Sequence, residues 1–483
     1  MFWRGVLGYL PVNVVQGVVG LLTIVTFTRL LTPAQFGDYA LGFSVMSLAH
    51  TLIFTWNEAA MARFWAGSQA QDGGHRHTSA IYRTWVVLTL VLGVSVLVAA
   101  LMPVSVGLHV AMLAGLCATL PRALMKLAQE RRRAAGEVSS AAGLDMGMTL
   151  GGFGIGAVLA WRGLGGAAPL IGAGLAAVFA LPFVFRRELS LASQAPLESE
   201  RVRTHAAYGV PVALSLILAL VLSSTDRFLL ASFLNQEAVG LYHAGYGLAN
   251  RTLDVVFIWL GAAGGPALVM ALERGGKPAL QAAAKEQAQL MALITLPAAV
   301  GLALVARPLA GLMIGGPLAA GAAHVTPWIA LSGILAGLTT HYFHQAFTLG
   351  KRTRLLIVAM LVPAGANLVL NLILIPRFGL DGALWATPLS YGLGLLASAV
   401  LGRGVLQLPV PWKALAQAGA ASLAMALVIL LLPATQGLAE LALKSVVGGV
   451  VYLTLVAAMD AGGLRSRSLD LLRARRQPSA SLA

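Results

Sequence analysis

The sequence is dominated by long apolar segments that recur at short intervals along the whole chain. A helix needs about 20 mostly apolar residues to cross a bilayer. About 14 segments meet this need, and we expect spanning helices at 6–28, 38–58, 82–102, 107–127, 138–160, 164–185, 208–230, 239–262, 288–312, 325–347, 355–375, 381–402, 414–433 and 440–460. Because backbone groups within the bilayer must be hydrogen-bonded inside each segment, the pattern predicts an all-α polytopic membrane protein.

The composition supports this fold class. The chain is 58% hydrophobic and 11% charged, whereas a soluble domain carries about a quarter charged residues. Its net charge of +15 does not indicate a nucleic-acid partner, because the basic residues fall between the apolar segments. The single cysteine, Cys117, excludes an intrachain disulfide and a thiolate metal cluster. The first apolar segment is too long for a signal-peptide core, so we interpret it as a membrane helix.

The distribution of Lys and Arg predicts the orientation of the chain. Of the 33 basic residues, 25 lie at the N-terminus, in alternate connections and in the C-terminal tail. Basic residues are retained on the cytoplasmic side. We therefore expect both termini in the cytoplasm, with short outer connections that hold few charges. The ninth segment is the least regular, because Pro297 and Pro308 interrupt it, and residues 311–324 are expected to form a long connection.

The stretch RLLTPAQFGDYAL, Arg29 to Leu41, predicts where the second helix begins. Thr32 is expected to be the N-cap, Pro33 the first helical residue, and Gln35 the partner that completes a capping box. Tyr39 suits the membrane interface, and Arg29 is expected to be an interfacial anchor rather than a ligand-binding residue.

Two short similarities indicate an internal duplication. Residues 29–39 align with residues 232–242 at an offset of 203, and 163–167 align with 379–383 at an offset of 216. We therefore expect two parallel six-helix bundles plus two C-terminal helices, an architecture suited to alternating access. The predicted domains are an N-terminal bundle (1–195), a C-terminal bundle (196–405), two extra helices (406–462) and a basic cytoplasmic tail (463–483).

Three motifs resemble a known family. The first helix boundary RLLTPAQFGDYAL, the segment STDRFLLASFLNQEAVGLYHAGYGLA (224–249) and the segment NLVLNLILIPRFGLDGALWAT (367–387) are similar to the polysaccharide-biosynthesis and O-antigen flippases. These flippases belong to the multidrug/oligosaccharidyl-lipid/polysaccharide exporter superfamily. The resemblance covers about residues 5–405.

The resemblance implies a transporter rather than an enzyme. Its cargo would be a polyprenyl-diphosphate-linked oligosaccharide, moved across the bacterial inner membrane for O-antigen, exopolysaccharide or capsule synthesis. Partners would include membrane lipids and a polysaccharide polymerase or export machinery. A lipid II flippase and a multidrug exporter of the same superfamily remain alternatives. A membrane glycosyltransferase, polymerase or ligase is disfavoured, because the outer connections are short and almost uncharged.

Charged and amide side chains within the apolar segments are the candidates for cargo contact, because a buried charge usually faces a cavity or a partner. Arg251 is the leading candidate for the diphosphate, with an ion pair to Asp254 as the structural alternative. Arg122, together with Arg63 at the cytoplasmic mouth of the second span, is expected to assist it. Asn367 and Asn371 could bond sugar hydroxyls or join neighbouring helices.

No cofactor or metal is expected apart from a proton or sodium ion that drives the cycle. The candidate coupling residues are Asp145, Asp226, Asp254, His341 and His344. Asp145 has no local partner in the sequence. His341 and His344 stand three residues apart, which would suit a proton relay, although histidines satisfied within the helix packing are the simpler interpretation.

Overall fold

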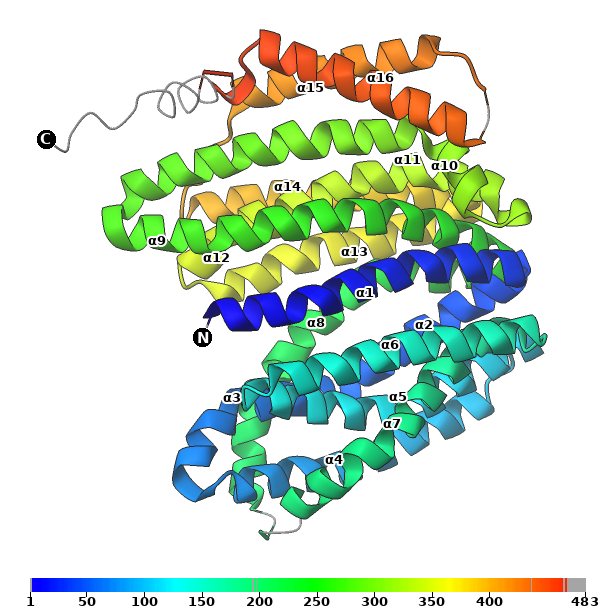
Figure 1. Cartoon of the computed structure of the whole chain (residues 1–483), viewed down its shortest axis with the longest axis vertical. Helices are drawn as coiled ribbons and strands as arrows, with labels where there is room; N and C mark the ends of the chain where they lie inside the picture. Colours follow the sequence, from blue (N-terminus) through cyan, green and yellow to red (C-terminus); the bar gives the residue numbers. More distant parts are fainter. Residues whose placement is uncertain (1, 193–194, 197, 436, 464, 467–483) are drawn as a thin grey trace, which may run out of the picture. The chain divides into compact units, whose positions relative to one another are not determined.

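The computed structural model describes residues 2–192, 195–196, 198–435, 437–463 and 465–466. Within these residues every regular element is a helix and none is a strand (Figure 1). The predicted all-α fold is therefore confirmed. Most of the predicted basic tail, 467–483, lies outside the described residues.

The chain divides into two compact units, and the first comprises Met1–Ala244, Ile314–Leu318 and Asn371–Ala383. Its helices pack mainly as the pairs α6–α7, α2–α5, α5–α7, α1–α6 and α3–α8. They are α1 (Phe2–Leu30), α2 (Pro33–Ile53), α3 (Thr55–Asp72), α4 (His75–Ala100), α5 (Val106–Ala134), α6 (Val138–Trp161), α7 (Ala168–Ala192) and α8 (Ser199–Phe233), with a 3₁₀ turn at Gly165–Ala167.

The second unit comprises Gly245–Met313, Ala319–Leu370 and Leu384–Ala483. Its helices are α9 (Gln236–Leu304, entering from the first unit), α10 (Ala306–Met313), α11 (Gly316–Leu338), α12 (Gln345–Leu349), α13 (Thr353–Phe378), α14 (Leu380–Arg403), α15 (Trp412–Leu431) and α16 (Gly437–Ala458). A π-helical turn at Thr339–Phe343 joins α11 to α12. The boundary between the units follows the packing of α8 on α2, α3 and α4, so it differs from the predicted domain boundary at 195/196.

Most helices have the length and composition of membrane spans. Twelve described helices are long and apolar enough to cross a bilayer, and the bent pair α2–α3 would make a thirteenth. The 69-residue α9 contains two of the predicted segments, and Gly276 interrupts it with non-helical angles (φ 62°, ψ −156°). Large apolar side chains such as Leu90 (70% exposed) and Leu431 (85% exposed) face outward, as contact with lipid requires. The chain is a multi-pass membrane protein, while the number fourteen stays a prediction.

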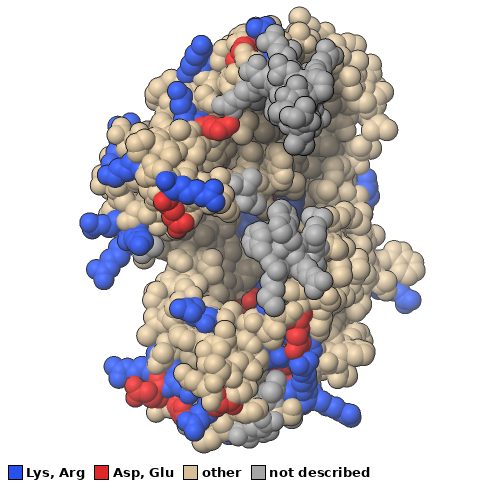
Figure 2. Space-filling model, turned by 60° about the vertical axis from the view of Figure 1, so that its left-hand side comes forward, with Lys and Arg blue, Asp and Glu red and all other residues tan. Residues whose placement is uncertain are grey.

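Charged residues are sparse on the surface. Figure 2 shows one face, on which many Lys and Arg side chains and fewer Asp and Glu side chains stand out from an otherwise uncharged surface. This imbalance is the one that the sequence predicts for the cytoplasmic side. The orientation of the termini itself stays a prediction.

The second predicted span is bent rather than straight. Helix α2 ends at Ile53, and α3 begins at Thr55 after a bend of 48°. The residues expected to form a cytoplasmic loop after 58 are therefore mostly helical, as α3 continues to Asp72. Gly73 and Gly74 then make the turn into α4 with positive φ angles (67° and 80°), a conformation that glycine adopts without steric cost.

The prediction of a long connection at 311–324 is wrong. Helix α10 ends at Met313 and α11 begins at Gly316, so only two residues separate them. The stretch contains four glycines and Pro317, which are typical of connections, and these hide its helical character. Gly315 lies in this short turn, and its amide donates a hydrogen bond to Oγ1 of Thr28 (3.0 Å). A methyl group at this position would collide with the carbonyl of Thr28.

The predicted start of the second helix at Thr32 and Pro33 is confirmed, and the second copy of the motif has a similar helix start. The amide of Gln35 donates to Oγ1 of Thr32 (3.3 Å), and the amide of Thr32 donates to Oε1 of Gln35 (3.1 Å). In the second copy, Asn235 caps α9 by accepting a hydrogen bond from the amide of Ala238 (2.9 Å). The aligned Gly163 and Gly379 both have positive φ angles, of 91° and 61°, at equivalent helix connections.

Candidate functional site

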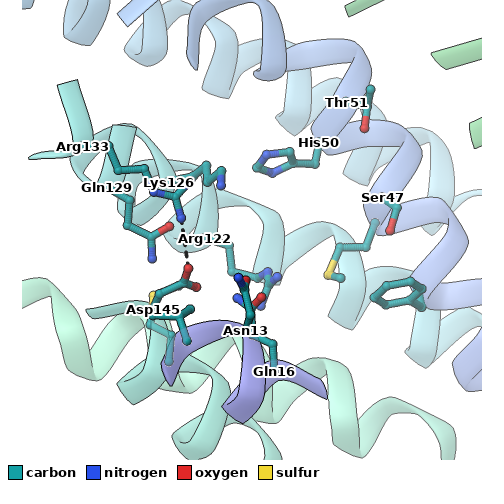
Figure 3. Close-up of a pocket in the computed structure, with 14 residues that line it drawn as sticks. Asn13, Gln16, Ser47, His50, Thr51, Arg122, Lys126, Gln129, Arg133 and Asp145 are labelled. Carbon is teal, nitrogen blue, oxygen red and sulfur yellow. Dashed lines mark hydrogen bonds and ion pairs between the residues drawn. The ribbon is translucent and has the colours of Figure 1, made fainter. Parts of the chain in front are cut away.

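The first unit contains a cavity of about 550 Å³ between α1, α2, α5 and α6. This volume lies within the usual range for small-molecule sites. Its polar lining consists of Asn13, Gln16, Ser47, His50, Thr51, Arg122, Lys126, Gln129, Arg133 and Asp145 (Figure 3). We refer to it as the cationic cavity, because Lys and Arg are its most numerous charged residues.

Helix α5 supplies the positive charge of the cationic cavity. Its lining residues Arg122, Lys126, Gln129 and Arg133 follow one another at intervals of four, three and four. Side chains at such spacings lie on one face of an α-helix. The helix begins at the N-cap Ser105, whose Oγ accepts a hydrogen bond from the amide of Leu108 (3.4 Å).

Ion pairs among the described residues compensate Lys126 and Arg133 but not Arg122. Arg133 binds Asp145 (3.1 Å) and Glu130 (3.0 Å), and Lys126 also binds Glu130 (3.1 Å). No hydrogen bond or ion pair joins Arg122 to any residue that the structure describes. Arg122 is half-buried and reaches toward Asn13 and Gln16 of α1 (Figure 3). It is therefore the guanidinium of the cavity most available to a ligand.

Helix α2 provides the wall that faces the basic stripe. Ser47, His50 and Thr51 line the cavity from this helix. The Nε2 atom of His50 lies 3.0 Å from a carboxylate oxygen of Glu58, which is only 5% exposed and belongs to α3. This contact spans the bend at Phe54. The break between α2 and α3 is therefore bridged by a side-chain pair whose histidine faces the cavity.

The chemistry of the cationic cavity suits an anion that also carries hydroxyl groups. Three basic side chains outnumber the single lining carboxylate of Asp145. A guanidinium binds phosphate oxygens bidentately and keeps its charge. The amides of Asn13 and Gln16 and the hydroxyls of Ser47 and Thr51 can donate and accept hydrogen bonds. Among the described residues, no three His, Cys, Asp or Glu side chains are arranged to hold a metal ion.

The three arginines predicted to bind cargo lie in different places. Arg122 lines the cationic cavity, whereas Arg63 lines a second pocket formed by α3 and α8. Arg251 is exposed on α9 in the second unit and lines neither pocket. Asp254 accepts a hydrogen bond from Asn250 (2.9 Å) and forms no ion pair with Arg251 among the described residues. The role of Arg251 stays a prediction.

Two predicted coupling carboxylates have partners that the sequence does not reveal. Asp145 is not a lone mid-span acid, because Arg133, twelve residues earlier, forms an ion pair with it. Asp226 is almost fully buried (1% exposed) and accepts hydrogen bonds from the hydroxyl of Tyr242 (2.6 Å) and the amide of Asn371 (2.7 Å). Both of its oxygens are thus engaged by groups from other helices.

The remaining candidates are placed by helix packing. Asn367 is 1% exposed and donates to Ser390 (3.5 Å), while Asn371 is 0% exposed. Their burial fits the alternative in which these amides join neighbouring helices. His341 stacks on Phe257 with ring centroids 5.8 Å apart. His341 lies in the π-helical turn, which is closed by a hydrogen bond from the amide of His344 to the carbonyl of Thr339 (2.9 Å). Because this turn is not α-helical, the three-residue spacing of His341 and His344 does not place them on one helix face.

Sequence reasoning missed most of the polar lining of the cationic cavity. Lys126 and Arg133 fall at the end of the predicted span 107–127 and after it, although their spacing from Arg122 indicates a stripe. Lys444 was also missed. It lies within the last span and pairs with Glu440 one helical turn earlier (2.5 Å). An i, i+4 spacing of opposite charges is the signal that could have found this pair.

The fold is similar to those of solved membrane transporters. A structure described as the lipid II flippase MurJ in an inward closed conformation has a TM-score of 0.75, with 13% identity over 93% of this chain and 98% of that one. An inward-facing multidrug resistance MATE family transporter of the MOP superfamily has a TM-score of 0.64, with 15% identity over 80% of this chain and 94% of that one. At these identities the likeness concerns the fold alone.

Comparison at the level of sequence families is more specific. No curated protein matches the chain. Residues 26–317 match the family described as polysaccharide biosynthesis protein. This segment includes α2 to α8, the basic stripe of α5 and the cavity residues of α2, α5 and α6. Because the match covers more than half of the 483 residues, the chain belongs to the polysaccharide biosynthesis protein family.

Proposed function

We propose that the protein is a flippase that moves a polyprenyl-diphosphate-linked oligosaccharide from the cytoplasmic to the outer leaflet by alternating access. The family membership supports a role in polysaccharide synthesis, and the transporter fold supports movement of the cargo across the membrane. The cargo would serve O-antigen, exopolysaccharide or capsule synthesis in the bacterial inner membrane. A polysaccharide polymerase or export machinery would then receive it.

The observation that carries this proposal is the guanidinium of Arg122 in the cationic cavity. It forms no hydrogen bond or ion pair with a described residue, and Lys126 and Arg133 lie on the same face of α5. A diphosphate would satisfy its donors with charge-assisted hydrogen bonds. The apolar tail of such a cargo can stay in the bilayer while the headgroup enters a polar cavity, which limits the cost of desolvation.

Substitution of the arginines tests the proposal. In a host that depends on this gene for polymer export, Arg122→Ala should lower export about tenfold or more, because one or two charge-assisted hydrogen bonds are lost. Arg122→Lys should have an intermediate effect, since it keeps the charge but not the bidentate geometry. Arg251→Ala is also expected to reduce export, with normal membrane insertion. Surface polymer and membrane-inserted protein are measured together.

Arg162→Ala is the matched control, because Arg162 is an exposed arginine of the same unit outside the cationic cavity. Its export should equal that of the wild type. Normal export by Arg122→Ala at normal protein level would refute the cargo role of the cavity. Export that continues when the whole gene is deleted would refute the flippase function.

We propose that an inward flux of protons or sodium ions resets the cycle through Asp226. Its burial and its two hydrogen bonds make its charge sensitive to any movement of Tyr242 or Asn371. In proteoliposomes, an imposed proton or sodium gradient should accelerate flipping of a lipid-linked oligosaccharide by the wild type and not by Asp226→Asn. Asp460→Asn, outside the spans, should respond like the wild type. Equal responses of wild type and Asp226→Asn would contradict this role.

Lipid II is the second candidate cargo. The specific observation in its favour is the likeness to the structure described as the lipid II flippase MurJ, which extends over 93% of the chain. Depletion of the protein distinguishes the two cargoes. Accumulation of cell-wall precursors would favour lipid II, whereas accumulation of lipid-linked polymer repeat units would favour the polysaccharide cargo.

A further inference from the structure

The first unit contains a second pocket, of about 450 Å³, between α3 and the N-terminal part of α8. It shares no lining residue with the cationic cavity. The Lys and Arg distribution predicts that α3 and the N-terminal end of α8 lie on the cytoplasmic side. We call it the α3–α8 pocket. Its polar lining includes Arg63, Gln71, Glu198, Glu200, Arg201 and Thr204.

The charge of the α3–α8 pocket is balanced. Its two arginines are matched by two glutamates. Glu198 binds Arg201 (3.1 Å) and also Arg76 (3.3 Å), so its charge is compensated inside the protein. Arg63 and Glu200 form no ion pair among the described residues and are both exposed. One donor group and one acceptor group of opposite charge therefore remain available, and a diphosphate would gain little in such a pocket.

Aromatic rings form one wall of the α3–α8 pocket. The guanidinium of Arg63 lies 6.0 Å from the ring centroids of both Phe64 and Tyr208, which holds it in place. The ring of Phe64 packs on the ring of His205 at 5.4 Å and meets that of Tyr208 edge to face at 5.6 Å. Phe64 therefore presents an apolar ring to this side of the pocket.

His205, which also lines the pocket, is paired with the buried His77. The Nε2 atom of His205 lies 3.0 Å from Nδ1 of His77, and the two residues are 2% and 0% exposed. A hydrogen bond between two imidazoles needs one nitrogen to accept, so at least one ring is neutral. The pair therefore carries at most one positive charge.

We propose that the α3–α8 pocket is a saccharide subsite that binds the glycan part of the cargo on the cytoplasmic side. This inference rests on the proposed flippase function. A sugar ring has an apolar C–H face, which fits the Phe64 wall, and a rim of hydroxyl groups. Arg63 and Gln71 can donate to these hydroxyls, and Glu200 can accept from them. The diphosphate and the glycan would then be recognised in two separate pockets of the same unit.

Binding measurements with two soluble probes test this division. The full-length protein in detergent is titrated with inorganic pyrophosphate and with the repeat-unit oligosaccharide released by mild acid from the host's own lipid carrier. Glu200→Ala and Gln71→Ala should each weaken oligosaccharide binding about tenfold and leave pyrophosphate binding unchanged. Arg122→Ala should weaken pyrophosphate binding and leave oligosaccharide binding unchanged. Phe64→Leu, which keeps apolar volume but removes the ring, should also weaken oligosaccharide binding.

Glu237→Ala is the matched control, because Glu237 and Glu200 are both exposed acids in the first turn of a helix. It should change neither affinity. Wild-type oligosaccharide affinity in Glu200→Ala and Gln71→Ala would overturn the subsite, as would a wild-type protein that binds no oligosaccharide. Either result could occur while polymer export still depends on the gene and on Arg122. The export measurements therefore test the flippase function independently of the saccharide subsite.

Discussion

Arg131 shows how far the environment of one charged residue can depart from its sequence context. In the sequence it belongs to the run Arg131–Arg133, which predicts a solvated cytoplasmic loop. In the structure it is 1% exposed. Its Nε and Nη2 atoms bind the carboxylate of Glu188 at 2.8 and 2.9 Å, and its guanidinium lies over the ring of Trp65. The hydroxyl of Tyr82 donates to the same carboxylate (2.7 Å).

Removal of Glu188 should therefore destabilise the first unit. In Glu188→Ala the guanidinium of Arg131 would stay buried without its bidentate partner. Breaking a buried ion pair on one side costs about 3–5 kcal/mol. We expect a clear fall in the thermal unfolding temperature of the purified protein in detergent.

Tyr82→Phe is the graded control for this network, because it removes one hydrogen bond and keeps the ion pair. It should cost about 1.5 kcal/mol. An unfolding temperature of Glu188→Ala equal to that of the wild type would show that water or another side chain compensates Arg131.

At the scale of elements, the two copies of the repeated motif meet each other. Helices α2 and α9 begin at Pro33 and Gln236, which are equivalent positions of the duplication. A methyl group at Gly37 would collide with the carbonyl of Gln236, and one at the equivalent Gly240 would collide with the carbonyl of Pro33. The contact is reciprocal, as expected for two repeats related by an approximate twofold axis. The two glycines thus permit the close crossing of these helices.

Substitution of either glycine should push α2 and the start of α9 apart. Gly37→Ala and Gly240→Ala are each expected to destabilise the protein by about 1–3 kcal/mol, because the added methyl meets backbone rather than a flexible side chain. The double variant should cost less than the sum, since one substitution already opens the contact that the other needs. Thermal unfolding of the three variants measures both effects.

Gly17→Ala provides the comparison, because nothing lies within 4 Å of a methyl group at that position of α1. Its stability should equal or slightly exceed that of the wild type, since alanine favours the helix by about 1 kcal/mol over glycine. Strictly additive losses in the double variant would mean that Gly37 and Gly240 act in separate contacts.

At the scale of the whole molecule, packing adds detail that helix prediction does not supply. The extra helices α15 and α16 share a core with the last part of α9, in which the hydroxyl of Tyr452 donates to the carbonyl of Leu293 (2.6 Å). They are therefore part of the second unit rather than an appendage. Likewise, α8 belongs with the first unit because it packs on α2, α3 and α4, although the repeat assigns it to the second half of the chain.

The sequence by itself determined the all-α membrane fold, the start of α2 and the repeated motif. Each of these depends on local chemistry: apolar segments of about 20 residues, the capping set Thr32, Pro33 and Gln35, and glycines with positive φ angles. It also singled out Arg122, because a charge inside an apolar segment stands out without any knowledge of its neighbours.

The tertiary structure alone decided which side chains act together. The cationic cavity combines residues of four helices, and the partner of Asp145 or of Arg131 lies on a different helix in each case. Pairings of this kind depend on the relative rotation and depth of packed helices. Hydropathy is insensitive to both, since it averages over a segment and discards the direction in which each side chain points. The same reason explains why the sequence does not reveal that Arg63 and Arg122 line separate pockets.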